Sequence, residues 1–301
     1  MRLGINTGFA VNRFPMPEQW LKVIGANLKL KHVQLTADII NPSWGDKIVN
    51  DLVDRINLAK KKYRISIDSV MTGAFTRVNH FSHPNYEIRE YWLDWFKKLA
   101  DIAVKVGAYD LSSHFGILCV DDYKDSRRRK AILKENIDLW RRLAGYGKQI
   151  GLKSLSWEPM SVSREYGETI SETKRLQKLL KNAAIPINLC LDVDHGNISS
   201  KNPRDSDYKA WLSEFAKYSP FIHIKQSSSD KSGHHPFTME YNESGAIRPA
   251  EMVRILKKQR GNNTLLFELS FREREPTDSL VLAQLKESVH YWRKYLKHDN
   301  N

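Results

Sequence analysis

The stretch EIREYWLDWFKKLADIAVKVGAYDLSSH, residues 87–114, shows how this chain is built. Its first part repeats apolar side chains three or four residues apart, as one face of an amphipathic helix requires: Ile88, Trp92, Trp95, Phe96, Leu99, Ile102, Ala103 and Val106. Gly107 is then typical of a helix C-terminal cap, and the short run Tyr109–Ser113 predicts a strand. The stretch is therefore one helix followed by one strand.

Short apolar runs of this kind recur eight times, and helical patterns separate them. The runs are Leu3–Asn6, His32–Leu35, Ile65–Val70, Tyr109–Ser113, Leu152–Trp157, Ile187–Leu191, Phe221–Ile224 and Leu265–Phe267. They begin roughly 37 residues apart on average, which suits one strand and one helix each. Alternating strands and helices predict a parallel sheet with right-handed crossovers. Eight units predict an α/β fold, the (β/α)8 TIM barrel, as a single domain over residues 1–301.

Composition places the chain among ordinary globular proteins. Hydrophobic residues make up 41% of the 301 residues and charged residues 28%. There is no apolar run long enough for a membrane helix, and the first residues do not resemble a signal peptide. Two scattered cysteines, Cys119 and Cys190, indicate a reducing compartment. We therefore expect a cytoplasmic protein without a membrane partner.

The net charge of +13 is open to several interpretations. A basic surface can attract nucleic acid, and it can equally attract anionic small substrates such as sugar phosphates. It can also reflect no more than solvated lysine-rich faces.

Polar residues close four consecutive predicted strands. They are Glu158, Asp192, His223 and Glu268. The C-terminal ends of barrel strands form the active site, so these side chains should meet there. Each alone is more often structural, but four in register predict a metal site. Three carboxylates and one imidazole suit Mn²⁺, Mg²⁺, Co²⁺ or Zn²⁺, and the oxygen-rich set favours Mn²⁺.

The segment Leu191–Asn197, LDVDHGN, resembles the sixth-strand motif of the xylose-isomerase-like superfamily of barrels. In that motif the aspartate binds the metal and the histidine contacts the substrate. The resemblance therefore selects Asp192 over Asp194 as the ligand and makes His195 a substrate-binding residue. The fifth, seventh and eighth strands have similar motifs in Trp157-Glu158-Pro159, His223-Ile224-Lys225-Gln226 and Phe267-Glu268-Leu269.

The resemblance implies a sugar epimerase or isomerase, with Glu158 and Glu268 as the catalytic pair. One would remove the proton beside the ketose carbonyl and the other would return one to the opposite face, through a metal-stabilised enediolate. The opening segment Leu3–Pro15, with Val33–Asp38, resembles the tetrulose-4-phosphate racemases of erythritol catabolism. L- and D-erythrulose phosphate are therefore the expected substrates. Members of this superfamily are often dimers or tetramers, so the resemblance implies a homo-oligomer of one of these sizes.

Further substrate contacts are expected from the loops. Lys225, Gln226 and Arg272 follow strands 7 and 8, the usual phosphate region of barrels, and His114 closes strand 4. Ketose 3-epimerases usually carry an arginine soon after the strand-7 histidine, whereas here that stretch reads SSSD, residues 227–230. A smaller or phosphorylated ligand is thereby favoured over a free hexulose. Aromatic residues of the early loops, Phe75 among them, are candidates to line the sugar-binding pocket.

Three other functions remain open at this point. Aldose–ketose isomerisation, or dehydration of an inosose, would use the same metal site. An endonuclease IV-like enzyme acting on abasic DNA would fit the basic charge, with His234 and His235 after strand 7, but no histidine closes the third strand. Nucleic acid is thus an unlikely partner and a small carbohydrate the expected one. An inactive sugar-binding barrel is disfavoured by the Glu158/Glu268 pair.

Overall fold

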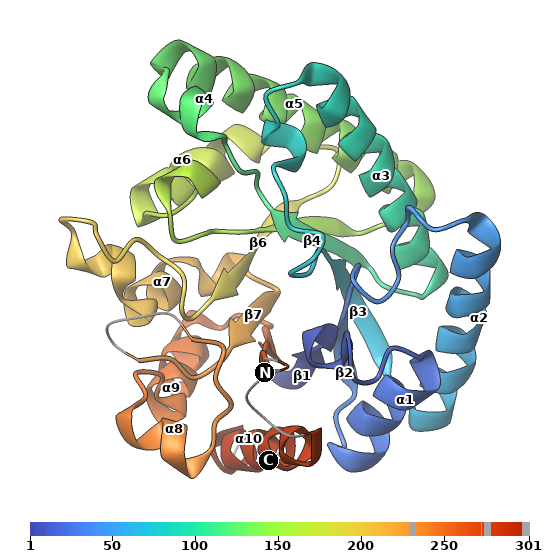
Figure 1. Cartoon of the computed structure of the whole chain (residues 1–301). Coiled ribbons are helices and arrows are strands. Elements are labelled where there is room, and N and C mark those ends of the chain that lie inside the picture. The colour runs from blue at the N-terminus through green and yellow to red at the C-terminus, as the bar shows by residue number, and fades with distance from the viewer. Residues whose placement is uncertain (229–232, 272, 274–277, 297–301) are drawn as a thin grey trace.

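Eight parallel strands close into a barrel in chain order, from β1 to β8, in the computed structural model (Figure 1). The structure describes residues 1–228, 233–271, 273 and 278–296. The strands are β1 (Arg2–Asn6), β2 (His32–Thr36), β3 (Ser66–Met71), β4 (Asp110–His114), β5 (Ser154–Glu158), β6 (Ile187–Asp192), β7 (Phe221–Ile224) and β8 (Thr264–Phe267). The barrel closes where β1 pairs with β8, with Arg2 opposite Thr264 and Ile5 opposite Phe267. The predicted (β/α)8 architecture is confirmed.

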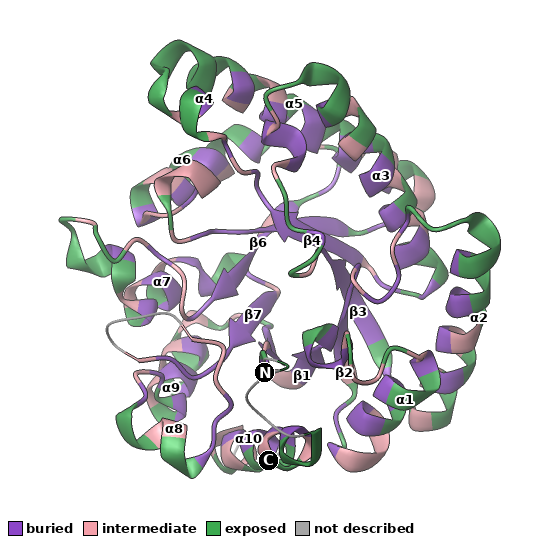
Figure 2. Ribbon diagram, in the orientation of Figure 1, coloured by how far each residue is buried: buried purple, intermediate pink, exposed green. Residues whose placement is uncertain are grey.

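Helices surround the strands and present their buried faces to them, while their outer faces are exposed (Figure 2). Within the described ranges the α-helices are α1 (Pro17–Lys22), α2 (Asp46–Tyr63), α3 (Tyr86–Lys105), α4 (Val120–Lys124), α5 (Ser126–Ile150), α6 (Ile170–Leu180), α7 (Tyr208–Phe215), α8 (Met239–Ser244), α9 (Pro249–Gln259) and α10 (Asp278–Leu296). A π turn, Val23–Asn27, extends α1, and a 3-10 turn, Ala216–Tyr218, extends α7.

The helix α3 illustrates why the local sequence folds in this way. Asn85 precedes it, and its side-chain oxygen accepts hydrogen bonds from the backbone N–H groups of Glu87 and Ile88. Its apolar face, which includes Trp95 and Phe96, is buried against the barrel. Gly107 follows with a φ of 82°, which a glycine adopts without strain. The predicted helix and its cap are confirmed, and β4 begins three residues later.

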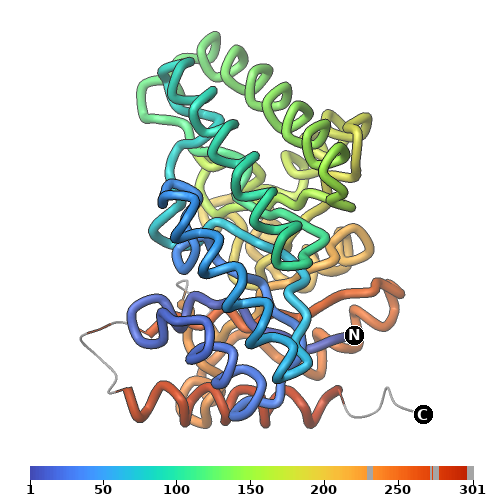
Figure 3. Tube along the Cα trace, turned by 90° about the vertical axis from the view of Figure 1, so that its right-hand side faces the viewer, coloured from blue at the N-terminus to red at the C-terminus, as the bar shows by residue number. Residues whose placement is uncertain are grey.

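The last helix packs beside the first βα unit. In Figure 3, α10 lies next to α1, although the two helices are at opposite ends of the described chain. Arg293 of α10 donates hydrogen bonds to the carbonyl oxygens of Leu28 and Lys29, just before β2. This contact joins the ends of the helical ring, as the β1–β8 pairing joins the sheet.

The barrel interior contains a buried carboxylate, Asp110 of β4. Four hydroxyl groups donate to it, from Ser69, Ser112, Ser154 and Ser156, at distances of 2.6 to 3.0 Å. Burial nevertheless raises the pKa of Asp110. These small polar side chains fill the interior without leaving the carboxylate unsatisfied.

Among the described residues, no helix is both long enough and apolar enough to cross a membrane. The assignment of residues 1–301 to a single domain stays a prediction.

Candidate functional site

The four residues predicted from the strand ends meet at one rim of the barrel. Glu158 ends β5, Asp192 ends β6, His223 lies in β7 and Glu268 directly follows β8. Each offers one nitrogen or oxygen atom, and these atoms all lie within 4.8 Å of one another. Three of the residues are buried and Glu268 is partly buried. The parallel register explains the meeting, because it pairs Asp192 with His223 directly.

The imidazole of His223 faces the three carboxylates through one nitrogen. Its Nδ1 lies 3.0 Å from Glu158 Oε1, 3.5 Å from Glu268 Oε2 and 3.8 Å from Asp192 Oδ2. Ligands that are roughly 2.1 Å from a shared ion stand roughly 3 to 3.5 Å apart, so these separations suit a divalent cation. The donor set also fits, because oxygen ligands with one imidazole are typical of Mn²⁺, Mg²⁺, Co²⁺ and Zn²⁺ sites.

The other nitrogen of His223 is held by a glutamine from the opposite side of the barrel. Nε2 lies 2.7 Å from Oε1 of Gln34 in β2, and that oxygen also accepts a bond of 3.2 Å from Asn6 in β1. A glutamine oxygen only accepts, so Nε2 of His223 carries a proton and Nδ1 is the atom that faces the carboxylates. Such a support orients a metal-binding histidine. Cys190 lies beside Nε2 at 3.4 Å, and burial raises the pKa of its thiol to about 11. Burial would lower the pKa of His223, but Cys190, Glu268 and Glu158 raise it well above the usual value, so without a cation Nδ1 is protonated as well, and a bound cation would replace that proton.

Lys225 places a fully buried ammonium group against the cluster. Its Nζ donates to Asp192 Oδ2 at 2.5 Å and to Glu268 Oε2 at 3.0 Å. Burial alone would lower the pKa of Lys225, but the carboxylates of Asp192, Glu268 and Glu158 raise it above its ordinary value. The lysine therefore stays charged and offsets part of the negative charge of the three carboxylates.

The carboxylates respond to the same charges. Burial would raise the pKa of Glu268, but the positive charges of His223, Lys225 and His234 bring it well below the usual value. Burial likewise opposes ionisation of Asp192, and His195 and Lys225 reverse that effect and lower its pKa. Both groups are thus held as carboxylates, the form in which they bind a cation.

Two histidines flank the cluster. His195 was predicted to contact substrate. Its Nδ1 donates a hydrogen bond of 3.0 Å to the carbonyl oxygen of Pro159, because a carbonyl oxygen can only accept. The same nitrogen is 3.5 Å from Glu158 Oε1. His234 lies on the other side, with Nδ1 at 3.6 Å from Glu268 Oε2, and burial lowers its pKa. Glu158 and Glu268 therefore each have a histidine beside them.

The remaining predicted substrate contacts lie elsewhere or outside the described residues. His114 is buried, and its Nε2 donates to the carbonyl oxygen of Val78 at 2.7 Å. The amide of Gln226 is buried and bonded to Asn242 and Ile247. Arg272 lies outside the described residues. Contact of these three residues with substrate stays a prediction.

Sequence reasoning did not single out Gln34 as a support for the site, and it considered His234 only for the DNA-directed alternative. A signal for Gln34 was present, because it is a polar residue between two apolar ones, Val33 and Leu35, in a predicted buried strand. No local pattern marks His234, since it reaches the cluster from a loop.

Comparisons with known proteins agree with this fold. The family model described as "Xylose isomerase-like TIM barrel" matches residues 8–295. The D-erythrulose 1-phosphate 3-epimerase of Brucella abortus is 40% identical over 299 residues, which cover 98% of this chain and 96% of that protein.

Solved structures show the same barrel. One from Rhodospirillum rubrum, provisionally described as a xylose isomerase, has a TM-score of 0.90 and 25% identity, and the match covers 98% of this chain and 99% of that one. The D-psicose 3-epimerase of Clostridium cellulolyticum H10, solved with D-tagatose, has a TM-score of 0.73. At 13% identity, with 98% and 99% of the two chains covered, this second likeness shows the fold alone.

Proposed function

Because the chain belongs to the xylose isomerase-like TIM barrel family, we propose that it is a divalent-metal-dependent 3-epimerase of a small ketose phosphate. Erythrulose phosphate is the first candidate substrate, by analogy with the Brucella relative. The predicted family and the predicted class of enzyme, a sugar isomerase or epimerase, are confirmed by the same likeness.

The observation that carries the proposal is the convergence of two glutamates on one cation site. Glu158 and Glu268 come from β5 and β8, with Asp192 and His223 of the intervening strands between them. A cation held by these four residues would draw electrons from the ketose carbonyl and make the neighbouring C–H bond more acidic. We expect Mn²⁺ to be the ion, with Mg²⁺, Co²⁺ and Zn²⁺ as alternatives.

The protein's own residues then move the protons. One glutamate takes the proton from C3, and the electron pair of the broken C–H bond passes to the carbonyl oxygen and leaves an enediolate. The second glutamate, in its acid form, returns a proton to the opposite face of C3. His195, which lies 3.5 Å from Glu158 Oε1, is placed to hold a substrate oxygen near the reacting carbon.

The first test follows proton exchange at C3. Manganese-loaded protein is incubated in D₂O with erythrulose 1-phosphate and, separately, with erythrulose 4-phosphate, because the relative's name places its phosphate on C1 and the narrower sequence resemblance places it on C4. We expect loss of the C3 proton signal in the proton NMR spectrum, together with racemisation. Appearance of an aldehyde would instead establish an aldose–ketose isomerase. Absence of exchange with every ketose would refute the proposal and leave inososes and abasic DNA to be tried.

The two-glutamate mechanism predicts that Glu158→Gln and Glu268→Gln each abolish racemisation, with a fall in kcat of roughly a hundredfold or more. The matched control is Glu90→Gln, which removes a surface carboxylate paired with Arg142. Near-normal turnover by either site variant would contradict the mechanism. A variant that still exchanges the C3 proton from one enantiomer alone would identify which face its remaining glutamate serves.

A further inference from the structure

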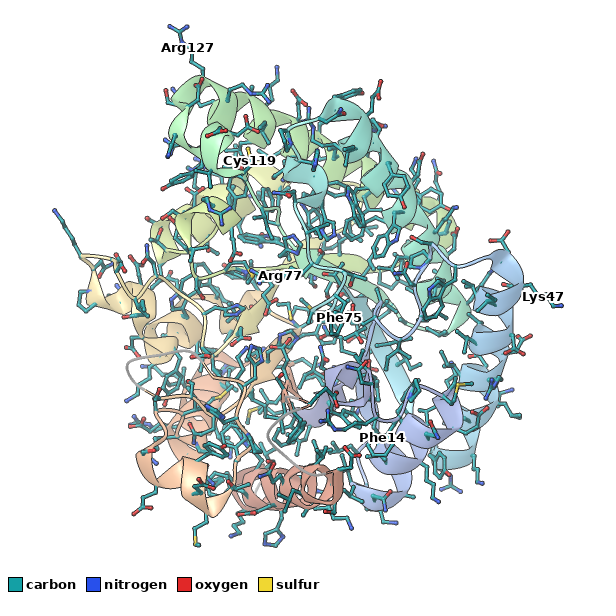
Figure 4. The ribbon with its side chains drawn as sticks, in the orientation of Figure 1. Phe14, Lys47, Phe75, Arg77, Cys119 and Arg127 are labelled. Carbon is teal, nitrogen blue, oxygen red and sulfur yellow. The ribbon has the colours of Figure 1, made fainter. Side chains whose placement is uncertain are left out.

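A cavity of about 440 Å³ begins at Glu268 and His234 and extends between the ends of β1, β2, β3 and β8. Its volume lies in the range of small-molecule sites and accommodates a four-carbon sugar phosphate. Because Glu268 is one of the two proposed proton-transfer residues, the part of the substrate beyond the reacting carbon would extend into this space. Phe75, whose side chain is exposed, lines its outer part and lies over the barrel in Figure 4.

Arg13, in the segment between β1 and α1, also lines this cavity. Its side chain is only 7% exposed, and Nη1 donates to the carbonyl oxygen of Phe271 at 2.9 Å. Among the described residues, Arg13 pairs with two exposed carboxylates. Nε pairs with Asp278 at 3.0 Å, and the Asp278 side chain is 80% exposed. Nη1 lies 3.3 Å from Glu273, whose side chain is 57% exposed. The guanidinium is therefore fixed in place, whereas its counter-ions lie in solvent.

The two partners differ in their relation to the cavity. Glu273 lines it, together with Arg13, whereas Asp278 does not belong to its lining. Asp278 thus holds the guanidinium from behind, and Glu273 occupies the side from which a ligand arrives. Asn12 also donates to Glu273, at 3.2 Å, so an anion that replaced this carboxylate would meet both Arg13 and Asn12.

The other charged groups of the cavity do not offer a comparable anion site. Among its described lining residues, Arg13 carries the one permanent positive charge. Asp38 also lines it, but its two carboxylate oxygens accept bonds from the Phe75 N–H and the Thr76 hydroxyl. Burial raises the pKa of Asp38, and these hydrogen bonds oppose that effect.

We propose that Arg13 binds the phosphate group of the substrate and that the phosphate displaces Glu273 from the guanidinium. The planar guanidinium matches a phosphate with two parallel hydrogen bonds, and a dianion competes well against a single exposed carboxylate. This assignment rests on the proposed function and extends it, because it makes Arg13 the residue that selects phosphorylated over free ketoses. It also moves the expected phosphate site from the loops after strands 7 and 8 to the loop after β1.

The test compares phosphorylated with free erythrulose in matched variants. Arg13→Gln should lower kcat/KM for the phosphorylated ketose roughly tenfold to a hundredfold, mainly through KM, as loss of a charge-assisted hydrogen bond does. The loss of kcat/KM on free erythrulose should be several times smaller, because that substrate has no phosphate for Arg13 to bind. Arg13→Lys should be intermediate, because a lysine keeps the charge but not the paired geometry.

The control is Arg89→Gln. Arg89 of α3 is a similarly buried arginine, with 4% side-chain exposure. It pairs with the partly exposed Glu135 and donates to the backbone carbonyl oxygen of His83, away from the cavity. Arg89→Gln should change kcat/KM for both substrates by the same factor, or for neither. Glu273→Gln gives a test in the opposite direction, because removal of the competing carboxylate should lower the KM for the phosphorylated ketose. This variant keeps the proposal falsifiable if Arg13→Gln does not fold.

The outcomes separate the two proposals. Wild-type turnover of free and phosphorylated erythrulose with equal efficiency, or an equal loss for both in Arg13→Gln, would overturn the role of Arg13 and leave the epimerase intact. If no ketose reacts, the proposed function fails, and calorimetric binding of the unreactive erythritol 4-phosphate then tests Arg13 alone. Binding that is lost in Arg13→Gln but kept in Arg89→Gln supports the phosphate site. No binding by the wild type overturns it.

Discussion

At the scale of single residues, the orientation of His223 depends on Gln34. The glutamine oxygen lies 2.7 Å from Nε2, so the ring can present only Nδ1 to the three carboxylates. Asn6 donates to the same oxygen and thereby fixes the orientation of the glutamine amide. A ligand that is held in one tautomer and one rotamer loses less freedom when a cation binds.

Gln34→Leu should therefore weaken cation binding while leaving all four proposed ligands in place. Loss of such a supporting hydrogen bond costs about tenfold to a hundredfold in metal affinity. Calorimetric titration of Mn²⁺ into metal-free protein measures the change. Gln19→Leu, on the exposed face of α1, serves as the control. Equal affinities for the two variants would show that Gln34 plays no part in the site.

At the scale of elements, a pair of buried histidines holds the segment between β3 and α3. His114 and His80 stack with their ring centres 4.6 Å apart, and each donates from Nε2 to a carbonyl oxygen of this segment, at Val78 and Thr76. Burial lowers the pKa of both rings, and for His114, where the charge of Arg77 adds to the effect, the pKa falls to about 3. Both rings are therefore neutral in the folded protein at neutral pH.

This pair predicts a loss of stability in acid. Below the ordinary histidine pKa of 6.5 the unfolded chain takes up a proton at His114, whereas the folded chain does not until the pH approaches about 3. The unfolded state then binds more protons, so the free energy of unfolding falls with falling pH, by about 1.4 kcal/mol per pH unit for one such group.

His114→Gln removes this contribution. Urea unfolding of the metal-free protein between pH 7 and pH 4 should show a shallower decline for His114→Gln than for the wild type, even if the variant is less stable at pH 7. The control His290→Gln changes an exposed histidine of α10. Parallel declines in all three proteins would argue that His114 is protonated in the folded state.

At the scale of the whole molecule, a cation at the rim would tie together four neighbouring strands, β5 to β8. A ligand that binds the folded state alone stabilises it by about 2.7 kcal/mol at a free concentration 100 times its dissociation constant. Without the cation, Lys225 compensates only part of the charge of the three carboxylates. Metal binding and barrel stability should therefore be coupled.

Addition of Mn²⁺ to metal-free protein should accordingly raise Tm by several degrees, at about 2 to 4 °C per kcal/mol for a protein of comparable size. Asp192→Asn should abolish most of this rise. Asp94→Asn, which changes an exposed carboxylate paired with Lys97, should keep it. A rise of the same size in both variants would indicate that the ion binds elsewhere. Differential scanning calorimetry gives all three values.

The sequence by itself determined the barrel and the composition of its candidate cation site. Strand and helix periodicities are local, so the eight units could be predicted without knowledge of any contact. Parallel strands end at one rim, so Glu158, Asp192, His223 and Glu268 could be expected to meet once the strand ends were located. This inference needed no loop conformation, because each of these residues ends or lies in a strand, or directly follows one.

Only the tertiary structure decided what surrounds that site. Gln34 reaches His223 across 189 positions of sequence, and Arg13 reaches Phe271 across 258. Both contacts arise because barrel closure brings β1 beside β8 and lets a side chain of β2 reach β7 across the interior. The packing of loops, which follows no period, likewise placed His114 in a buried stack and Arg13 beside the cavity. The local sequence thus determines in which strand a residue lies, whereas closure of the barrel determines which residue it contacts across the interior.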